Sequence, residues 1–497
     1  MAKVHFHAQA CTTLENHDGW SSWLSPWARH PPARGSPQRG CVVTTRVTVG
    51  IDIGTTSVKA VATDEHGTVV ARARVPHRLI AGHAGELAHD AAHAWADNVV
   101  TALTEVTSGD VEVLGVNVAA MVPSLCAVDA SGRPISHGLL YGDARGADPS
   151  GASGADPSNS GELTRFLAWL VEQHPDAAGY WPAQAVANAA LCGVGAIDSV
   201  TAMTTLPLFD FTGWDPDVAA GAGLHEVARL PQIVSGSDSP GMVTVDGPAR
   251  GAPMAGGTID AFAEQLVAGA DSEGDVLVIL GATLICWAVI PEWVEVPGLW
   301  TIPHTAPGRI LIGGPSNAGG MFINWARSLC GVPQERSPNL TDDLAPDRVP
   351  VWQPYLRGER VPLHDADRRA SIHDLDIGMD ADSVMRAAYE STGFAIRHQL
   401  DLASLTPNRI VATGGGVRDV AWTRAIADCT GLDVHCVAVP EGGALGTAYL
   451  ARVTAGLERS AADAGRWART ERVVQPSPAW AGAAGHRYVR YRALSDA

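Results

Sequence analysis

The chain has 497 residues, of which 46% are hydrophobic and 18% are charged, and its formal net charge is -18. This composition excludes a disordered protein, and the length is too great for one hydrophobic core, so we expect two domains. The acidic balance argues against a nucleic-acid partner, because phosphate backbones select basic surfaces. No apolar run approaches the roughly 18 residues needed to cross a bilayer, so no membrane partner is expected.

The eight cysteines show neither a C-x-x-C pair nor zinc-type spacing, which makes a reducing cytoplasm the simplest location. Residues 1–46 lack strand and helix patterns, and we interpret them as a disordered leader. Deleting residues 1–45 is therefore expected to leave stability and turnover unchanged. Two alternatives are a targeting or partner-binding arm and a segment that does not belong to the native protein.

Residues 47–62 predict a β-hairpin with a polar tip. Two apolar runs, Val47 to Ile51 and Val58 to Ala62, flank a turn made of Gly54, Thr55, Thr56 and Ser57. The glycine lets backbone amides approach a ligand, and the hydroxyls and Lys59 add hydrogen-bond donors. Asp52 suits a phosphate only when a divalent cation lies between them. The pattern indicates a Mg²⁺–nucleotide site, and the alternative is an ordinary hairpin with a polar turn.

The following elements are expected in chain order. A third antiparallel strand is predicted at Val69 to Val75, a helix at Asp90 to Val106 and a strand at Val111 to Val118. Residues 146–161 are rich in Gly, Ala, Ser, Asp and Pro and predict a loop. A helix that includes Leu163 to Val171 then stops before Pro175.

A second block repeats the pattern of the first. The run Val276 to Leu280, the turn Gly281-Ala282-Thr283 and the run Leu284 to Ile290 again read as strand, small-residue turn and strand. Two hairpin tips that face each other would hold the phosphates of one nucleotide from both sides. The duplication is typical of an α/β protein with two actin-like ATPase (ribonuclease H-like) domains and a nucleotide cleft between them.

Further motifs appear in a fixed order. They are Leu140-Tyr141-Gly142-Asp143-Ala144-Arg145, Gly256-Gly257-Thr258-Ile259-Asp260, Pro354-Tyr355-Leu356-Arg357-Gly358-Glu359-Arg360, Ala412-Thr413-Gly414-Gly415-Gly416 and Pro440-Glu441-Gly442-Gly443-Ala444-Leu445-Gly446. With the two hairpin turns, these motifs resemble the FGGY carbohydrate kinase family, and its xylulokinase-like branch most of all. The resemblance spans residues 47–455. It implies an ATP-dependent kinase that transfers the γ-phosphate of ATP to a hydroxyl of a small ketose or polyol, such as a xylulose-like pentulose.

The resemblance also implies roles for individual residues. Asp260 becomes the general base, and the alternative is that it only caps the apolar helix that follows. Asp52, with Asp260, is expected at Mg²⁺, and Met121, Asp143, Arg145 and Asp260 at the sugar. The residues expected at ATP are Gly54, Thr55, Thr56, Ser57, Lys59, Gly281, Thr283, Gly414, Gly415, Gly416 and Asp419. Glu359 and Arg360 are interpreted as a structural ion pair and left out of the site.

Two departures from the family pattern bear on the substrate. Met121-Val122-Pro123-Ser124 stands where xylulokinase-like enzymes usually have a Met-His pair, which argues against assuming D-xylulose. Gly281-Ala282-Thr283-Leu284 replaces the more usual Gly-Thr-Ser-Gly, although Thr283 keeps one hydroxyl. A catalytically impaired nucleotide-binding sensor of the same fold is therefore the main alternative. An actin-like or chaperone-type ATPase is a further one, and the Asp-x-Arg sugar segment argues against it.

The motifs also set the expected domain limits. An N-terminal domain is predicted from residue 47 to 265, a C-terminal domain from 266 to 470, and a tail from 471 to 497. Tyr488, Tyr491 and Leu494 have helical spacing, so the tail is expected to dock as a terminal helix. The expected partner is a small-molecule sugar or polyol, and the sequence leaves a homodimer open.

Overall fold

A computed structural model describes residues 44–82, 85–146, 161–235, 237–304, 308–333, 344–439 and 441–495. Most of the predicted leader and most of the predicted loop at 146–161 lie outside the described residues. The first strand begins at Thr45, two residues earlier than predicted, because Thr45 and Arg46 pair with Val111 and Glu112. No helix in the described ranges combines the length and the apolar character that a membrane span requires.

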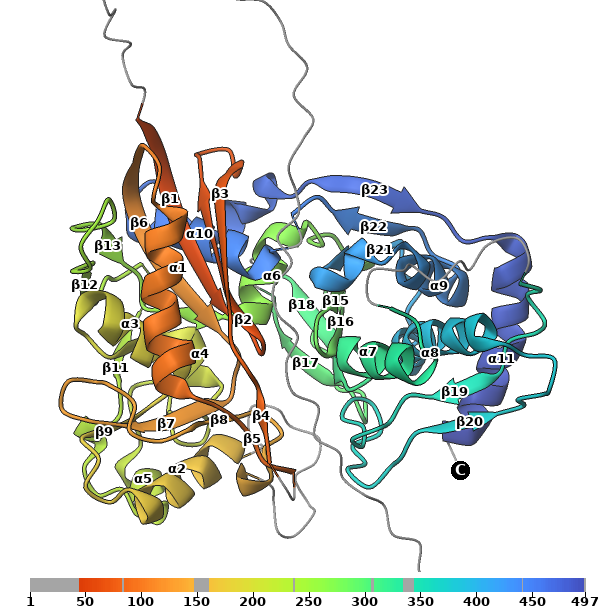
Figure 1. Cartoon of the computed structure of the whole chain (residues 1–497), viewed down its shortest axis with the longest axis horizontal. Coiled ribbons are helices and arrows are strands. Elements are labelled where there is room, and N and C mark those ends of the chain that lie inside the picture. Colours follow the sequence, from red (N-terminus) through yellow and green to blue (C-terminus); the bar gives the residue numbers. More distant parts are fainter. Residues whose placement is uncertain are drawn as a thin grey trace, which may run out of the picture. The chain divides into compact units, whose positions relative to one another are not determined.

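The N-terminal half of the described chain is built on a seven-stranded sheet (Figure 1). Three antiparallel strands come first, as predicted, and the fourth long strand runs parallel to the first. The strand order is β12-β13-β6-β1-β2-β3, with β14 also paired to β6. The bounds are β1 Thr45–Ile53, β2 Ser57–Thr63, β3 Val69–Pro76, β6 Val111–Ala120, β12 Gly241–Met242, β13 Pro253–Met254 and β14 Thr258–Ile259.

A second seven-stranded sheet repeats this arrangement in the C-terminal half. Its order is β17-β18-β16-β15-β21-β22-β23, in which β15, β16, β18 and β17 are antiparallel and β15, β21 and β22 are parallel. The bounds are β15 Asp275–Leu280, β16 Leu284–Ile290, β17 Trp300–Pro303, β18 Ile310–Ser316, β21 Arg409–Thr413, β22 Val434–Val437 and β23 Thr470–Val474. The predicted duplicated α/β fold is thus confirmed.

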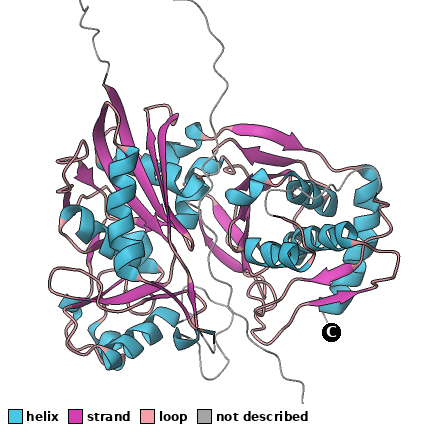
Figure 2. Ribbon diagram, viewed as in Figure 1, coloured by secondary structure: helices cyan, strands magenta, loops and turns pink. Residues whose placement is uncertain are grey.

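Both faces of each sheet are covered by helices, which explains why the central strands are apolar throughout. In β15, Val276, Val278 and Leu280 belong to one core cluster, and Leu277 and Ile279 belong to another on the opposite face. Helix α1 (Asn98–Val106) covers one face of the first sheet, and α8 (Ala381–Leu402) and α9 (Val420–Thr430) cover one face of the second (Figure 2). The predicted helix at 90–106 is present, but its first part, Ala92–Asp97, is π-helical.

Two helices connect the sheets. Helix α6 (Asp260–Ala268) packs on β15 and β21 of the second sheet, and α10 (Gly442–Thr454) packs on β1 and β6 of the first. The two helices also pack against each other. A helix late in the chain therefore completes the N-terminal core, and its first residues lie beside the strand that precedes the first hairpin turn.

The remaining strands and helices lie outside the two seven-stranded sheets. The strands of three smaller sheets are β4 Ile80–Ala81, β5 Leu87–His89, β7 Ser124–Val128, β8 Gly138–Leu140, β9 Gly179–Trp181, β10 Ala196–Asp198, β11 Gln232–Val234, β19 Val351–Gln353 and β20 Ser371–His373. The remaining α-helices are α2 Glu162–Gln173, α3 Ala183–Cys192, α4 Ser199–Met203, α5 Pro216–Gly221, α7 Gly320–Leu329 and α11 Pro478–Ser495.

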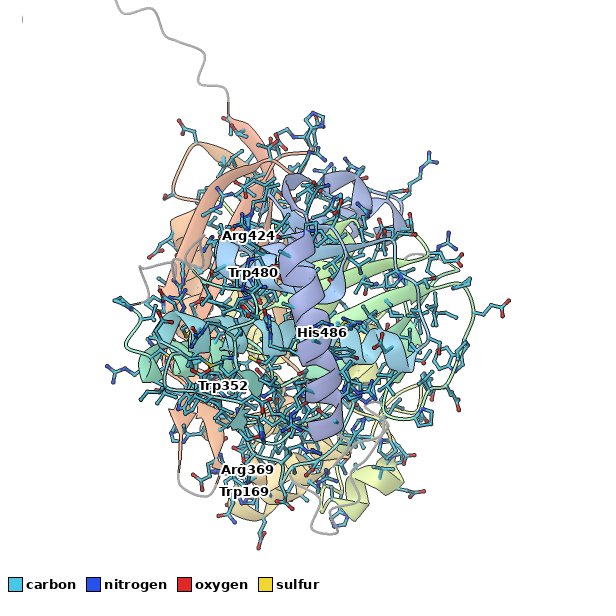
Figure 3. The ribbon with its side chains drawn as sticks, turned by 90° about the vertical axis from the view of Figure 1, so that its right-hand side faces the viewer. Trp169, Trp352, Arg369, Arg424, Trp480 and His486 are labelled. Atoms are coloured by element: carbon cyan, nitrogen blue, oxygen red, sulfur yellow. The ribbon has the colours of Figure 1, made fainter. Side chains whose placement is uncertain are left out.

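The predicted terminal helix is α11, and it is anchored by polar contacts as well as apolar ones. Figure 3 shows α11 with Trp480 and His486, and Arg424 of α9 close to its start. The guanidinium of Arg386 lies 4.1 Å from the centroid of a Trp480 ring. Arg487 donates from Nε and Nη2 to the two carboxylate oxygens of Glu390, at 2.6 and 2.7 Å.

Candidate active site

The first hairpin turn, residues 54–57, is here called the first phosphate loop. It is closed by a hydrogen bond of 3.1 Å from the Gly54 N–H to the Ser57 carbonyl oxygen. Thr56 is exposed, whereas Ser57 is buried and its hydroxyl oxygen accepts from Arg74 Nε at 3.2 Å. The hydroxyl groups of Thr55 and Tyr141 lie 3.4 Å apart. The loop therefore offers exposed donors at its tip, while its base is tied into the sheet.

Buried side chains hold this loop from behind. The indole N–H of Trp95 donates to Nδ1 of His89 at 3.0 Å, so Nδ1 is an acceptor and the ring proton lies on Nε2. Nε2 then donates to the Thr55 carbonyl oxygen at 2.9 Å. Burial lowers the pKa of His89 to about 4, and the neighbouring His77 ring contributes to this shift. His89 is thus neutral, and its single tautomer fixes the backbone of the first phosphate loop.

Asp52 and Asp260 lie at the same edge of the first sheet, because β1, which contains Asp52, and β14, which ends just before Asp260, both run parallel to β6. Asp52 pairs in register with Ala119 of β6, and Ala119 pairs with Thr258 of β14, which ends just before Asp260. The carboxyl ends of parallel strands form the usual ligand-binding edge of an open α/β sheet. Asp52 is buried, whereas Asp260 is partly exposed. Asp260 is the first residue of α6 rather than its cap, and its Oδ1 accepts from the Ala261 N–H at 2.7 Å.

The surroundings of the two carboxylates shift several pKa values. Burial and then the charge of Asp52 raise the pKa of Asp260 to about 6. Lys59 lies directly opposite Asp52 on β2, with Nζ 3.4 Å from Oδ2, and the charge of Asp52 raises the pKa of Lys59. Glu264 lies one helical turn after Asp260 and interacts with the charges of Lys59, Asp52 and Asp260. Burial raises the pKa of Glu264 to about 8. Three carboxyl groups and one ammonium group thus share a small volume.

The N-terminus of α10 closes this cluster. The Gly443 N–H donates to the carboxylate of Glu264, and a Cβ atom at position 443 would lie only 3.1 Å from Cγ of Asp52. A side chain at this position would crowd the Asp52 carboxylate and require it to shift, so glycine lets the N-terminus of α10 approach closely. The positive end of the α10 dipole also favours the negative charge that it faces.

The residues present fit a magnesium ion held together with a nucleotide. Oδ1 of Asp52 is fully covered and has no hydrogen-bond partner among the described residues, a costly state unless a cation or its water completes it. Within the same residues, no group of three or more His, Cys, Asp or Glu side chains is arranged as a metal cage. Mg²⁺ usually takes only one or two carboxylates and completes its shell with water and phosphate oxygens, so the two observations agree.

Residues 281–283, here called the second phosphate loop, lie beside the glycine triplet. The Gly281 N–H donates to the Thr283 carbonyl oxygen at 3.1 Å, and a Cβ atom at Gly414 would lie 2.9 Å from the Leu280 carbonyl oxygen. Gly415 is exposed, and no atom lies within 4 Å of the position that its Cβ would take. Gly414 is thus required by packing, whereas Gly415 offers bare backbone to a ligand.

Asp419 has a different environment from the other predicted ATP-binding residues. Its Oδ1 accepts from the backbone N–H groups of Ala421 and Trp422 and caps α9. Its Oδ2 accepts from Arg327 Nη2 at 2.8 Å and from the Tyr389 hydroxyl at 2.7 Å. These contacts hold α9 in place, and a role for Asp419 in ATP binding stays a prediction.

The predicted sugar-binding pair, Asp143 and Arg145, is engaged within the protein. The buried carboxylate of Asp143 accepts from Arg145 Nε and Nη2, at 2.8 and 2.6 Å, and also from the backbone of Leu87. The Arg145 guanidinium lies 4.9 Å from the centroid of a Trp169 ring. The third predicted sugar-binding residue, Met121, is buried in the first core. In the described structure these residues shape the loop beside the site, and direct contact with a sugar stays a prediction.

Glu359 and Arg360 do not form the structural ion pair that the sequence suggested. The buried Glu359 carboxylate accepts from the Ser316 hydroxyl at 2.7 Å and from the Asn317 N–H at 2.8 Å. Arg360 instead lies over the Tyr141 ring, with Cζ 6.0 Å from its centroid. Arg360 thus links the C-terminal half of the chain to the segment that carries Asp143.

Sequence reasoning missed Glu264, His89 and the N-terminus of α10. The sequence did contain a signal for Glu264: it is four residues after Asp260, which was already a candidate, and residues four apart lie on the same face of a helix. His89 gave none, because its contact with Thr55 depends on how β5 packs behind the loop. The proximity of Gly443 to Asp52 joins residues from opposite ends of the fold, and only packing brings them together.

Comparison with known proteins agrees with this geometry. Two family models match the chain: the N-terminal domain of the FGGY family of carbohydrate kinases at residues 47–150 and the C-terminal domain at residues 276–455. A xylulose kinase of Streptomyces coelicolor is 28% identical, with 84% of this chain and 90% of the relative covered. A glycerol kinase of Rhodospirillum rubrum is 26% identical, with 87% and 95% covered.

Solved structures extend the comparison to three dimensions. The crystal structure of xylulose kinase from Rhodospirillum rubrum has a TM-score of 0.74 and 26% identity, and the match covers 90% of this chain and 98% of that one. The ligand-bound xylulose kinase from Lactobacillus acidophilus has a TM-score of 0.76 at 20% identity, a likeness of fold.

Proposed function

Since the chain belongs to the FGGY family of carbohydrate kinases and is an ATP-dependent carbohydrate kinase, we propose that its acceptor is a small ketose or polyol and that Asp260 is the general base. The observation that carries the proposal is the position of Asp260. Asp260 is partly exposed, its pKa is raised by the nearby charge of the Mg²⁺-fitting Asp52 as well as by burial, and it follows β14, which pairs with the same strand, β6, as β1 does.

The chemistry assigned to Asp260 is simple. An acceptor hydroxyl attacks the γ-phosphorus of ATP, its O–H proton passes to the Asp260 carboxylate, and the bond between the γ-phosphorus and the bridging oxygen breaks to release ADP. The raised pKa of Asp260, about 6, makes the carboxylate a better proton acceptor than an ordinary aspartate while it is still ionised near neutral pH. Most of the rate enhancement in such transfers comes from alignment and charge neutralisation.

Asp52 would hold a magnesium ion through its covered Oδ1, directly or through water. The ion, when bound, neutralises the phosphate charge and orients the γ-phosphate. Lys59 forms an ion pair with the Asp52 carboxylate from the opposite strand and helps to hold it in place. Gly54, Thr55, Thr56 and Ser57 would contact phosphate oxygens with backbone and hydroxyl donors.

The nucleotide is proposed to lie between the two phosphate loops. Gly281 and Thr283 would bind its phosphates from the second loop, and Gly414, Gly415 and Gly416 would lie against its adenosine part. The exposed backbone at Gly415 supports this assignment. The domain limits proposed above, 47–265 and 266–470, then place one phosphate loop in each domain.

The class of acceptor rests on the relatives. Similar proteins are named xylulose kinase and glycerol kinase, which supports a ketose or polyol of a few carbons. We infer that a xylulose-like pentulose or a related compound is the acceptor. The apolar Val122-Pro123 pair beside Met121 favours an acceptor that makes few polar contacts on that side.

An ADP-release assay against a panel of pentuloses, hexuloses and polyols tests this function. At least one pentulose or polyol is expected to stimulate ADP release far above the rate without acceptor, and Asp260→Asn should abolish that stimulation. If MgATP binds while no acceptor stimulates turnover, the protein is a nucleotide-binding sensor and the proposal is wrong.

A further inference from the structure

The segment Pro354 to Arg360 is fixed next to the second phosphate loop. Glu359 is bonded to Ser316 and Asn317 at the end of β18, and Gly319 and Gly320, which follow, pack directly against residues 281–284. The Glu359 carboxylate is thus held by Ser316 and Asn317, and it forms no salt bridge with the Arg360 guanidinium in the described structure. The backbone on which Arg360 stands is thus set by the nucleotide-binding side of the molecule.

The side chain of Arg360 carries two covered donors that nothing satisfies. Its Nε and Nη2 atoms are fully covered and have no hydrogen-bond partner among the described residues. These two nitrogens form one edge of the guanidinium, from which two N–H bonds point in parallel. Leaving both donors unsatisfied is unfavourable, because each has lost its bonds to water without gaining a protein partner.

The same edge is occupied in other arginines of this chain. Nε and Nη2 of Arg145 donate to the two oxygens of Asp143, those of Arg409 to Asp275 and those of Arg487 to Glu390, at distances between 2.6 and 2.9 Å. In each case the edge takes two oxygen atoms of one group, which is the bidentate geometry that arginine favours. The edge of Arg360 has the same two donors but no partner among the described residues, and its guanidinium carbon lies 6.0 Å from the centroid of the Tyr141 ring.

The groups around Arg360 belong to the acceptor side. Its guanidinium lies over Tyr141, whose hydroxyl lies 3.4 Å from that of Thr55 in the first phosphate loop. Glu162 accepts from the Gly142 N–H at 2.6 Å; burial raises its pKa to about 7, and the charge of Arg360 acts in the opposite direction. The carboxylates of Glu359 and Glu162 attract the Arg360 charge, and the exposed Arg357 repels it. None of these groups is hydrogen-bonded to Nε or Nη2 of Arg360 in the described structure.

We propose that Arg360 is a further acceptor-binding residue, whose Nε and Nη2 donate to two adjacent oxygens of the sugar or polyol. This inference rests on the proposed function and adds a contact from the C-terminal half of the chain to an acceptor that Asp260 holds from the N-terminal half. Adjacent oxygens on neighbouring carbons of a ketose or polyol match the spacing that the edge needs. Acceptor binding thereby bridges both halves through one side chain.

The test measures acceptor and nucleotide binding separately. D-xylulose is titrated calorimetrically into the MgADP-loaded full-length chain for the wild type, Arg360→Gln and Arg360→Lys, and MgADP is titrated into each protein alone. Arg369→Gln is the matched control, because Arg369 is exposed and bonds only to carbonyl oxygens of its own turn. Thermal unfolding midpoints confirm that each variant is folded.

The expected result is a ten- to hundredfold loss of D-xylulose affinity in Arg360→Gln, a smaller loss in Arg360→Lys, and MgADP affinity within about twofold of the wild type throughout. Unchanged D-xylulose affinity in Arg360→Gln would overturn the inference and leave the proposed function intact. A loss of MgADP affinity alone would overturn it as well, because Arg360 would then bind phosphate. If the wild type binds no D-xylulose, the same titrations use the pentulose, hexulose or polyol that stimulates ADP release most strongly. If no such compound binds, the proposed acceptor class fails, and the assignment of Arg360 to it fails as well.

Discussion

Asp260 and Asp52 are both aspartates at strand ends, yet their surroundings assign them different tasks. Asp260 is partly exposed at the first position of α6, where a substrate can reach it. Asp52 is buried and paired with Lys59, and one of its oxygens is covered and has no partner among the described residues. Accessibility suits a base, and a covered oxygen suits a cation ligand. The two substitutions below separate these roles.

Asp260→Asn keeps the size of the side chain but removes the proton acceptor, so kcat should fall by roughly two to four orders of magnitude while ADP affinity holds. Asp52→Asn should instead raise the Mg²⁺ concentration needed for half-maximal activity, because an amide is a weaker magnesium ligand than a carboxylate. Steady-state kinetics at several Mg²⁺ concentrations measure both effects. Near-normal turnover of Asp260→Asn with the best acceptor would mean that another residue is the base.

His89 gives a prediction about acid stability. The pKa of His89 is about 4 in the folded protein, whereas its ordinary value, which applies to the unfolded chain, is 6.5. Between these two pH values the unfolded chain therefore binds more protons than the folded protein. The stability that His89 contributes is therefore fully present above pH 6.5 and is lost as the pH falls toward 4. The loss amounts to about 3 kcal/mol, at about 1.4 kcal/mol for each pKa unit.

The measurement is chemical unfolding at pH 7.5 and pH 5 for the wild type and His89→Gln, since a glutamine amide can still donate to the Thr55 carbonyl oxygen. The wild type should lose more stability than the variant over this interval. Equal losses in the two proteins would show that His89 is not buried in the neutral form. His66→Gln on the surface is the control for the same change of residue type, because His66 is exposed.

At the scale of elements, α11 is held by a buried ion network. Arg487 reaches from α11 to Glu390 on α8, and Arg386 bonds to both Glu390 and Asp428. The side chains of Arg386, Glu390 and Asp428 are at most 1% exposed. Removing one member of such a network leaves a charge buried without its partner, which costs more than the intact network contributes.

Arg487→Ala is expected to lower the free energy of unfolding by about 3–5 kcal/mol. Arg490→Ala on the same helix removes a half-exposed pair with Asp374 and should cost less than about 1 kcal/mol. Urea unfolding followed by circular dichroism compares the two variants with the wild type. If both variants lose the same small amount of unfolding free energy, the buried ion network does not hold α11, and the apolar contacts made by its own Tyr488 and Tyr491 are sufficient.

For the described chain as a whole, the backbone of α10 packs directly against the backbone of β1 and of α6. A Cβ atom at Gly50 of β1 would lie 1.9 Å from the Ala444 carbonyl oxygen, and one at Gly446 would lie 1.8 Å from the Ala263 carbonyl oxygen of α6. These contacts involve backbone atoms, which cannot rotate away as a flexible side chain would. The position of Gly443 beside Asp52 therefore depends on glycine at two further sites.

Gly50→Ala should displace α10 from β1, lower the thermal unfolding midpoint by several degrees and reduce kcat, because the N-terminus of α10 moves away from Asp52 and Glu264. Gly482→Ala on α11 is the control, since no atom lies within 4 Å of its Cβ position and alanine favours a helix by up to about 1 kcal/mol. Scanning calorimetry and an activity assay measure both effects. A fully active and stable Gly50→Ala would show that α10 tolerates displacement.

Local sequence determined the two hairpins, their turns and the duplicated fold. Short apolar runs on either side of the small-residue turns Gly54–Ser57 and Gly281–Thr283 encode strands and turns through interactions between near neighbours, so one sequence is enough to predict them. The family resemblance added the order of motifs. Asp260 could be located in this way, but the sequence could not decide between base and cap. The structure places it one residue inside the helix.

Tertiary structure alone decided the contacts between distant segments. The sequence does not reveal that Asp143 is satisfied by Arg145, that Asp419 is taken up by Arg327 and Tyr389, or that Arg360 lies over Tyr141. In each case the outcome depends on which polar groups remain unpaired after packing, a property of the whole fold. Sequence names the residues capable of chemistry, and packing determines which of them keep free donors and acceptors for a ligand.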